Sequence, residues 1–299
     1  MWRLVGLIGV VGVMGCRSSP SWLKEAPLIG IRVKDDLGRE IYLSQAPRRV
    51  AIAVPEALPL WEKAGLLDRV VAACYGSGEN PRIYYLLCDD SLSLGEALFR
   101  AQVEWVWVAR PTQVAAYSKA KTYVYHPTSP EAWLRHLRLL GEVYDNRLVM
   151  EVADSLTKVL QAYDQQLKEA RRFRVMVLSE REGGEIYTRS HPLTSLIERA
   201  GGNVPYTDSA GRAVAAVPPE SIAKALPEII LVPEGAAARV DDLLRICPDL
   251  YSSPAIQYKR IFSTSRELLQ QPYANPLQTL YTLLQVLHPE IAGAPVSSK

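Results

Sequence analysis

The chain has 299 residues, of which 48% are apolar and 22% charged, and its formal charge at pH 7 is only +2. These are the proportions of a soluble globular protein, and the length suffices for two domains of ordinary size. They exclude wholesale disorder. A near-neutral chain without a basic stripe is not a dedicated nucleic-acid-binding protein, so no nucleic-acid partner is expected.

The N-terminus has the features of an export signal. One basic residue precedes an uncharged apolar run over residues 4–14, which is too short to span a bilayer but matches a secretory signal peptide. The stretch Val13-Met14-Gly15-Cys16 resembles a bacterial lipobox. This resemblance implies that residues 1–15 are a signal peptide, that Cys16 carries lipid, and that residues 16–28 form a tether. The alternative is an ordinary signal peptide with an incidental cysteine.

Three cysteines remain once the lipobox cysteine is set aside. Cys74 and Cys88 flank one loop, so they can form a disulfide in an oxidising compartment and leave Cys247 alone. The alternative is that all three are small buried apolar side chains. The chain has no Cys-x-x-Cys motif and no paired-histidine spacing, so no metal site and no cofactor is expected.

Strand-like and helix-like segments alternate through the first half of the chain. An alternating hairpin over residues 31–34 and 40–43 comes first. The expected buried strands then cover 49–54, 70–74, 105–109 and 122–125, and the expected helices cover 56–64, 94–101 and 130–143. Such alternation predicts a mostly parallel sheet with helices on both faces.

A long segment without Gly or Pro follows, and the alternation then resumes. Between residues 147 and 172 apolar residues recur at helical spacing, and a helix of about 25 residues would be about 38 Å long. The later strands are expected over 174–179, 185–187, 228–232 and 259–264, and the helices over 192–200, 218–225 and 276–287. The predicted fold is α/β: two Rossmann-like lobes with a ligand cleft between them, joined by one long rigid helix. The predicted divisions are an N-terminal lobe over 29–145, the connecting helix over 146–172, a C-terminal lobe over 173–292 and a tail over 293–299.

A faint internal repeat relates the two halves. Glu96 precedes the segment Glu104–Val108 by eight residues, and Glu220 precedes Glu228–Val232 by the same interval. Each glutamate is expected to begin a short helix that leads into a buried strand. The alternative is that both are ordinary acidic residues in the first turn of a helix.

The order of several stretches resembles a known family. They are Val33–Glu40, Ala64–Val71, Gly95–Ala97 with Val106–Val108, Leu139–Glu142, and Leu196–Gly202 with Pro218–Val232. Together they resemble the periplasmic binding proteins with a single helical backbone, which serve ABC importers for haem, siderophores, cobalamin and some bare metals. The resemblance implies a monomeric solute-binding protein, not an enzyme, with a permease of the inner membrane as its partner. It also implies that Glu96 and Glu220 dock onto arginines of that permease; the alternative is that both are solvated helix caps.

The chain departs from that family at one place. A Ser-Pro-Ser run and a Thr-Glu pair are usual after the first strand of the lobe, whereas this chain has Val54-Pro-Glu-Ala-Leu-Pro59. In the family this segment helps to line the cleft, so the departure bears on the identity of the ligand and less on the importer role.

The candidate ligand-binding residues follow strands of both lobes. They are Tyr75, Arg82, Tyr84 and Tyr85 in the first half, and Arg189, His191, Arg266 and Tyr273 in the second. Tyrosine rings stack on flat macrocycles, a phenolate ligates ferric iron, and arginine pairs with carboxylates. This set predicts an anionic iron chelate, haem or a ferric siderophore, with cobalamin ranked second. Any single tyrosine is as readily a packing residue, and His191 is as readily a helix cap as a metal ligand.

Other functions are weighed against this prediction. The chain has no Gly-x-Ser-x-Gly motif, Walker loop or dinucleotide fingerprint. A chelatase-like or tetrapyrrole-processing enzyme on a related two-lobed fold is one alternative, and a lipoprotein scaffold with a degenerate cleft is another. The expected location is outside the cytoplasm, in the periplasm or at the cell surface, anchored through Cys16.

Overall fold

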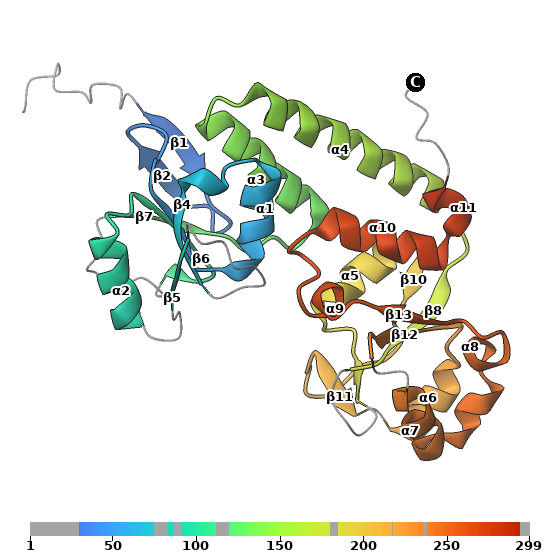
Figure 1. The fold of residues 1–299 in the computed structure, drawn as a ribbon. Helices are drawn as coiled ribbons and strands as arrows, with labels where there is room; N and C mark the ends of the chain where they lie inside the picture. The colour runs from blue at the N-terminus through green and yellow to red at the C-terminus, as the bar shows by residue number, and fades with distance from the viewer. Residues whose placement is uncertain are drawn as a thin grey trace, which may run out of the picture.

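The structure is a computed structural model that describes residues 30–74, 83–86, 91–111, 120–179, 185–216, 218–235 and 238–293. Two lobes built of strands and helices lie beside each other, and the helix α4 (Arg147–Leu167) runs along one edge of the pair (Figure 1). This arrangement confirms the predicted α/β fold, in which two lobes are joined by one helix.

The N-terminal lobe is built on a parallel sheet of five strands in the order β5-β4-β3-β6-β7. The strands are β3 (Val50–Ile52), β4 (Val70–Cys74), β5 (Tyr84–Leu86), β6 (Trp105–Val108) and β7 (Lys121–Val124). Along the chain, β4 and β5 are added on one side of β3, and β6 and β7 are then added on its other side. The direction of strand addition therefore reverses between β3 and β6. Ligands of open α/β sheets bind at the carboxyl ends of the strands beside such a reversal.

Helices and a hairpin cover this sheet. They are β1 (Ile31–Lys34) with β2 (Glu40–Leu43), η2 (Pro55–Ala57), α1 (Leu58–Lys63), η3 (Leu67–Arg69), α2 (Ser91–Arg100) and α3 (Pro130–Val143). The core beneath them is rich in aromatic rings. Trp61 packs edge-to-face against Trp105 and Trp107, and Tyr123 stacks on Trp107 at 4.5 Å between ring centroids. Each large aromatic side chain buries a large apolar area. Such side chains therefore suit a short central strand whose two faces are both covered.

The C-terminal lobe repeats the plan with a smaller sheet. Four parallel strands lie in the order β10-β8-β12-β13: β8 (Phe173–Val177), β10 (Gly202–Asn203), β12 (Ile229–Pro233) and β13 (Ile261–Thr264). A separate antiparallel pair joins β9 (Glu185–Tyr187) to β11 (Val214–Ala216). The helices are α5 (Pro192–Arg199), α6 (Pro219–Ala225), α7 (Ala238–Ile246), η5 (Pro248–Ser252), α8 (Pro254–Gln257), α9 (Arg266–Gln270), α10 (Pro276–Leu287) and α11 (Pro289–Ala292).

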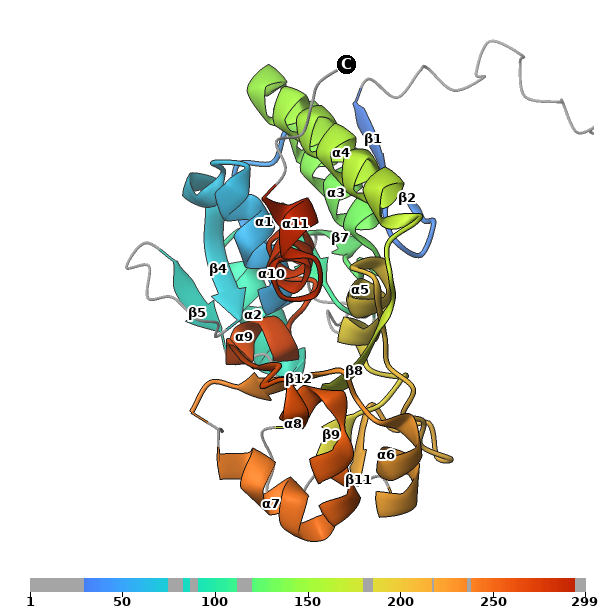
Figure 2. The ribbon, with the colours of Figure 1, turned by 90° about the vertical axis from the view of Figure 1, so that its right-hand side faces the viewer.

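The connecting helix α4 has 21 residues and begins where the side chain of Asn146 accepts a hydrogen bond from the Val149 amide. It lies beside α3 in both views (Figures 1 and 2). It ends at Leu167, earlier than the predicted end at residue 172. After the helix, the buried carboxylate of Glu228 pairs with Arg171 and accepts a hydrogen bond from the backbone amide of Arg174 at 3.0 Å. These contacts hold the chain where it enters β8.

Direct contacts hold the two lobes together on the side of the cleft nearest α4. The indole nitrogen of Trp133, in α3, donates to the backbone oxygen of Ala274 in the C-terminal lobe at 3.2 Å. Arg199 of α5 pairs with Glu131 of α3 and with Asp164 of α4, each at 2.5 Å. A single buried cluster of apolar side chains runs through both lobes. The relative position of the lobes is therefore set by packing and ion pairs as well as by the helix.

Most predicted elements agree with the structure within one or two residues, and the hairpin, α3 and α10 agree at both ends. The prediction that Glu96 begins its helix is wrong, because α2 begins at Ser91 and Glu96 lies inside it. Gly95 is therefore an internal helix residue. Burial of Leu98, which is 1% exposed, outweighs the roughly 1 kcal/mol that an internal glycine costs. Glu220 does lie in the first turn of α6, as predicted.

A glycine at the end of α5 allows the C-terminal turn to pack closely. Gly201 has φ +86°, and a Cβ atom there would lie 2.5 Å from Nε2 of His288. We expect Gly201→Ala to lower the free energy of unfolding by about 2 kcal/mol or more, because left-handed strain adds to a steric clash. Gly65→Ala is the matched control, since Gly65 has φ +68° but no neighbouring atom within 4 Å. Denaturant unfolding of both variants checks this, and equal losses would contradict the close contact with His288.

Candidate functional site

Two adjoining cavities lie in the cleft between the lobes. The first, named here the acidic cavity, has a volume of about 530 Å³ and includes Leu58 and Glu62 of the N-terminal lobe and Glu234, Glu267 and Asn275 of the C-terminal lobe in its wall. The second, named the aromatic cavity, has a volume of about 390 Å³ and includes Val54, Glu56, Tyr125, Pro192 and Tyr273 in its wall. Gln271 borders both cavities. The cleft thus lies between the lobes, as the sequence predicted.

The cleft is placed by the ends of the parallel strands. Val54 lies just beyond β3, Ala109 follows β6, and Tyr125 follows β7; all three line the aromatic cavity. From the other lobe, Glu234 follows β12 and Ser265 follows β13 to line the acidic cavity. Carboxyl ends of parallel strands are where α/β lobes bind ligands.

The unusual segment after the first strand of the N-terminal lobe forms part of the cleft. Val54 and Glu56 line the aromatic cavity, while Pro55, Leu58 and Pro59 line the acidic cavity. Its two prolines limit the backbone freedom of this wall. Residues of this segment therefore contribute to the walls of both cavities.

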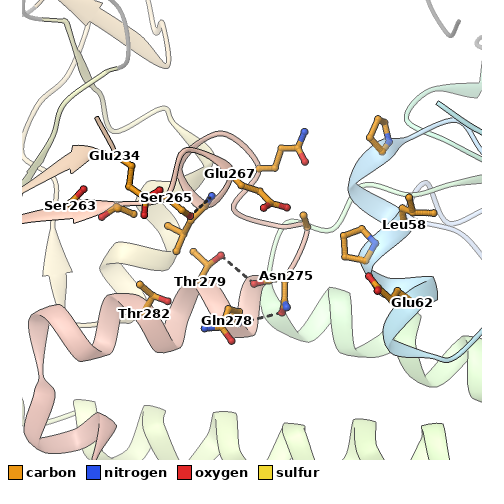
Figure 3. Close-up of a pocket in the computed structure, with 16 residues that line it drawn as sticks. Leu58, Glu62, Glu234, Ser263, Ser265, Glu267, Asn275, Gln278, Thr279 and Thr282 are labelled. Atoms are coloured by element: carbon orange, nitrogen blue, oxygen red, sulfur yellow. Dashed lines mark hydrogen bonds between the residues drawn. The ribbon is translucent and has the colours of Figure 1, made fainter. Parts of the chain in front are cut away.

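The acidic cavity has carboxylates on both sides. Figure 3 shows Glu62 on α1 facing Glu267, which extends from α9, with Glu234 and Ser265 deeper on the C-terminal side. The start of α10 forms its floor. There the side chain of Asn275 accepts a hydrogen bond from the Gln278 amide at 3.3 Å, and the Thr279 hydroxyl donates to the backbone oxygen of Pro272 at 3.1 Å. The floor is thus a capped helix start.

The aromatic cavity is bordered by rings that belong to a buried network. Tyr125 is 1% exposed and packs against Trp107 and His136. His136 in turn lies 2.9 Å from a carboxylate oxygen of Asp36 and 2.8 Å from the Tyr123 hydroxyl. Burial raises the pKa of Tyr125 well above its ordinary value, so its hydroxyl is protonated at neutral pH. The wall therefore presents a fixed neutral phenol and not a phenolate.

Among the predicted ligand residues whose side chains the structure describes, Tyr273 lies in the wall of a cavity. It borders the aromatic cavity, and its hydroxyl donates to the backbone oxygen of Thr128 at 2.8 Å and lies 2.6 Å from the Ser195 hydroxyl. Burial raises the pKa of Tyr273, so it too is a neutral phenol at pH 7.

The two predicted arginines of the C-terminal lobe do not line either cavity. Arg189 is exposed and pairs with Glu198 at 3.2 Å. Arg266 is the exposed first residue of α9, and its guanidinium lies near Gly235. Arg266 is nevertheless the chain neighbour of Ser265 and Glu267, which line the acidic cavity.

The remaining predicted residues have other positions. Tyr84 and Tyr85 belong to β5, the edge strand of the N-terminal sheet, whereas Tyr75 and Arg82 lie outside the described residues. Cys74 is disulfide-bonded; Cys88, its predicted partner, lies outside the described residues, as does Cys16. Cys247 is a free buried thiol. Within the described part of the chain, no three His, Cys, Asp or Glu side chains are grouped in a way that could hold a metal ion.

His191 is built into the start of α5. Its Nδ1 atom accepts a hydrogen bond from the Leu193 amide at 3.1 Å, and its ring stacks on Tyr187 at 3.9 Å between centroids. Of the two roles predicted for His191, helix cap or metal ligand, the structure therefore supports the helix cap. Burial lowers the pKa of His191 from 6.5 to about 4.

This shift predicts a pH-dependent stability. An unfolded His191 takes up a proton near pH 6.5, whereas the folded one stays neutral down to about pH 4, so the free energy of unfolding falls as the pH drops between these values. The ring is partly exposed, so we expect a loss of only about 1–2 kcal/mol after allowing for solvent screening. His191→Asn keeps a capping side chain and should remove this share of the pH dependence. Denaturant midpoints at pH 4.5 and 7 check this; parallel curves for the two proteins would contradict it.

Sequence reasoning missed most of the residues that line the cleft. The missed residues include Glu56, Glu62, Tyr125, His126, Glu234 and Glu267. Their position in the chain was the available signal. Tyr125 and Glu234 come directly after strands, and Glu267 is the second residue of the helix that follows the last strand. Arginines and tyrosines suit an anionic iron chelate by residue type, but residue type alone does not reveal which side chains face the cleft.

Comparisons with known proteins agree with this architecture. Residues 96–268, more than half of the chain, match the family model described as periplasmic binding protein. No curated protein matches the chain in sequence. The described helices include none with the length and apolar character to cross a membrane.

Three solved structures of similar fold are representative. The apo haem-binding protein RhuT from Roseiflexus sp. RS-1 is 18% identical, with 82% of this chain and 99% of that chain covered and a TM-score of 0.62. The vitamin B12 binding protein BtuF of Vibrio cholerae is 18% identical, with 84% and 99% covered and a TM-score of 0.65. Helicobacter pylori CeuE with Ni(II) bound is 16% identical, with 87% and 90% covered and a TM-score of 0.63. At these identities the likeness is one of fold. Together with the family match, it shows that this chain belongs to the periplasmic binding protein family and that its role is to bind a solute, not to catalyse a reaction.

Proposed function

We propose that this protein captures a metal chelate of the haem, ferric siderophore or cobalamin type and delivers it to the permease of an ABC importer. The observation that carries the proposal is the cleft between the lobes, whose two cavities of about 530 and 390 Å³ adjoin at Gln271. Each has the size of a small-molecule site, and together they suit a ligand as large as a metal chelate. Similar folds that bind haem and vitamin B12 add support.

Ligand binding by the purified protein tests this proposal. Titration with haem, cobalamin and ferric siderophores, measured by calorimetry and by tryptophan fluorescence, should show one-to-one binding of one class without turnover. The absorption spectrum of protein taken from cells provides an independent reading of a bound chelate. Failure to bind any of these chelates, or tight binding of free zinc or manganese ions alone, would refute the proposal.

Membership of the family implies export to the periplasm, and we propose that the mature protein is anchored there by lipid on Cys16. We expect Cys16→Ser to move the protein from the membrane fraction to the soluble fraction, because the lipid is attached through that sulfur. Fractionation of cells followed by immunoblotting measures this. Cys247→Ser is a suitable control, since Cys247 is a buried thiol within the C-terminal lobe. Identical partition of the Cys16→Ser variant and the natural protein would exclude the anchor.

A further inference from the structure

In the part of the chain that the structure describes, the carboxylates that line the two cavities are not balanced by lysine or arginine. Glu62, Glu234 and Glu267 line the acidic cavity, and Glu56 lines the aromatic cavity. Among the described residues, no lysine or arginine lines either cavity. An anion that enters such a cleft is repelled by the carboxylates, whereas a cation or an N–H donor is attracted.

A buried hydroxyl provides a second and independent indication of a ligand. Tyr125 is 1% exposed and borders the aromatic cavity, and its hydroxyl has no hydrogen-bond partner among the described residues. The neighbouring Tyr273 differs, because its hydroxyl is already bonded to Thr128 and Ser195. Buried polar groups in proteins are nearly always paired, so this unpaired hydroxyl, buried in a residue that borders the cavity, would gain a partner from a polar group of a ligand that reaches it.

Arg266, the exposed first residue of α9, stands between Ser265 and Glu267 of the acidic cavity but does not itself line either cavity. Two other arginines lie outside the cavity walls. Arg189 is neutralised by Glu198 outside the cavity walls, and Arg199 is occupied by Glu131 and Asp164 at the junction of the lobes. Their positive charges are therefore not available to carboxylates of a ligand in the cleft.

We infer that the ligand is a chelate that combines an apolar body with N–H donor groups, either ammonium or amide, and that it does not carry an excess of carboxylates. The inference rests on the proposed function and specifies its ligand. The apolar body lies against Val54, Tyr125 and Tyr273 in the aromatic cavity. The donor groups reach Glu234 and Glu267 in the acidic cavity, where charge-assisted hydrogen bonds form.

A matched pair of probes tests the charge preference. The first is a ferric trihydroxamate chelate with a free terminal ammonium group, and the second is the same chelate with that group acetylated. We expect the ammonium form to bind about tenfold more tightly or better, and haem, with its two propionates, to bind more weakly than either. Glu234→Gln/Glu267→Gln should remove the difference between the pair. Glu151→Gln, on the exposed face of α4, should preserve it.

A second variant addresses the hydroxyl. Tyr125→Phe removes one oxygen from the cavity wall, so we expect the unliganded protein to unfold at the same denaturant concentration or a higher one. The affinity for the ammonium chelate should fall about threefold to tenfold. A loss of stability without a loss of affinity would show that the hydroxyl serves the fold and not the ligand.

The outcomes separate the inference from the function on which it rests. If haem binds most tightly and the double glutamine variant binds it better still, the inference about charge is overturned while the role in chelate capture survives. If cobalamin, whose periphery carries amides, binds most tightly, its affinity must also fall in the double glutamine variant, and an unchanged affinity overturns the inference. If the folded protein binds none of these probes, the proposed function and the inference fail together.

Discussion

Replacing Glu96 and Glu220 together by alanine should lower uptake of the ligand by cells about 30-fold or more, while the affinity of the purified protein changes less than about threefold. The expected loss follows from our proposal that both glutamates dock onto arginines of the permease, since loss of an interfacial charge pair costs about 2–5 kcal/mol. Neither residue lines a cavity, and both are exposed. The helices α2 and α6 that carry them lie on the sides of their lobes away from α4 (Figure 1).

The existing contact of Glu96 does not prevent this role. Glu96 pairs with Arg100 one turn further along α2, but 65% of its side chain is exposed. Such surface pairs contribute little to stability, so Glu96 can exchange Arg100 for an arginine of a partner.

The matched control for the docking experiment is Glu142→Ala/Glu151→Ala. These glutamates are also exposed and also pair with arginines, Arg138 and Arg147, but they lie on α3 and α4. Uptake should be unchanged in the control if position matters and not merely the loss of two negative charges. Equal uptake by the docking variant and the natural protein, at equal amounts of each in the cell envelope, would exclude the docking role.

Trp133→Ala should produce the largest loss of stability, about 3–5 kcal/mol. Trp133 is 1% exposed, and it lies at the junction of α3 with the C-terminal lobe. The change leaves a cavity and also leaves the backbone oxygen of Ala274 without its donor. Because this contact joins the lobes, we also expect a weaker affinity for the ligand. Denaturant unfolding measures the stability and calorimetry measures the affinity.

Trp133→Phe separates the two contributions. Phenylalanine retains most of the apolar contact but cannot donate to Ala274, so we expect a smaller loss of about 1–3 kcal/mol. If both substitutions lower the denaturant midpoint equally, the hydrogen bond dominates and the packing argument is wrong. If neither substitution lowers the free energy of unfolding by more than about 0.5 kcal/mol, the lobes do not meet at this residue as the structure indicates.

Much of the architecture could be predicted because local sequence patterns determine it. The run Trp105–Val108 is apolar on both faces, which suits a central parallel strand. Ser129 precedes Pro130 and caps α3 by accepting a hydrogen bond from the Ala132 amide. The predicted helix over 94–101 starts three residues later than α2, which begins at Ser91.

The cleft residues were predicted less well because the relevant distances are not local. The sequence by itself determined the fold class, the order of strands and helices, and the presence of a cleft at the carboxyl ends of the strands. Only the tertiary structure decided which charges face that cleft. Arg189 meets Glu198 because the turn before α5 brings residues nine positions apart together. Glu62 and Glu267 share one cavity because the two lobes are packed against each other. The sign of the charge in a cleft depends on side-chain direction and lobe placement, which are properties of the packed chain and not of its local sequence.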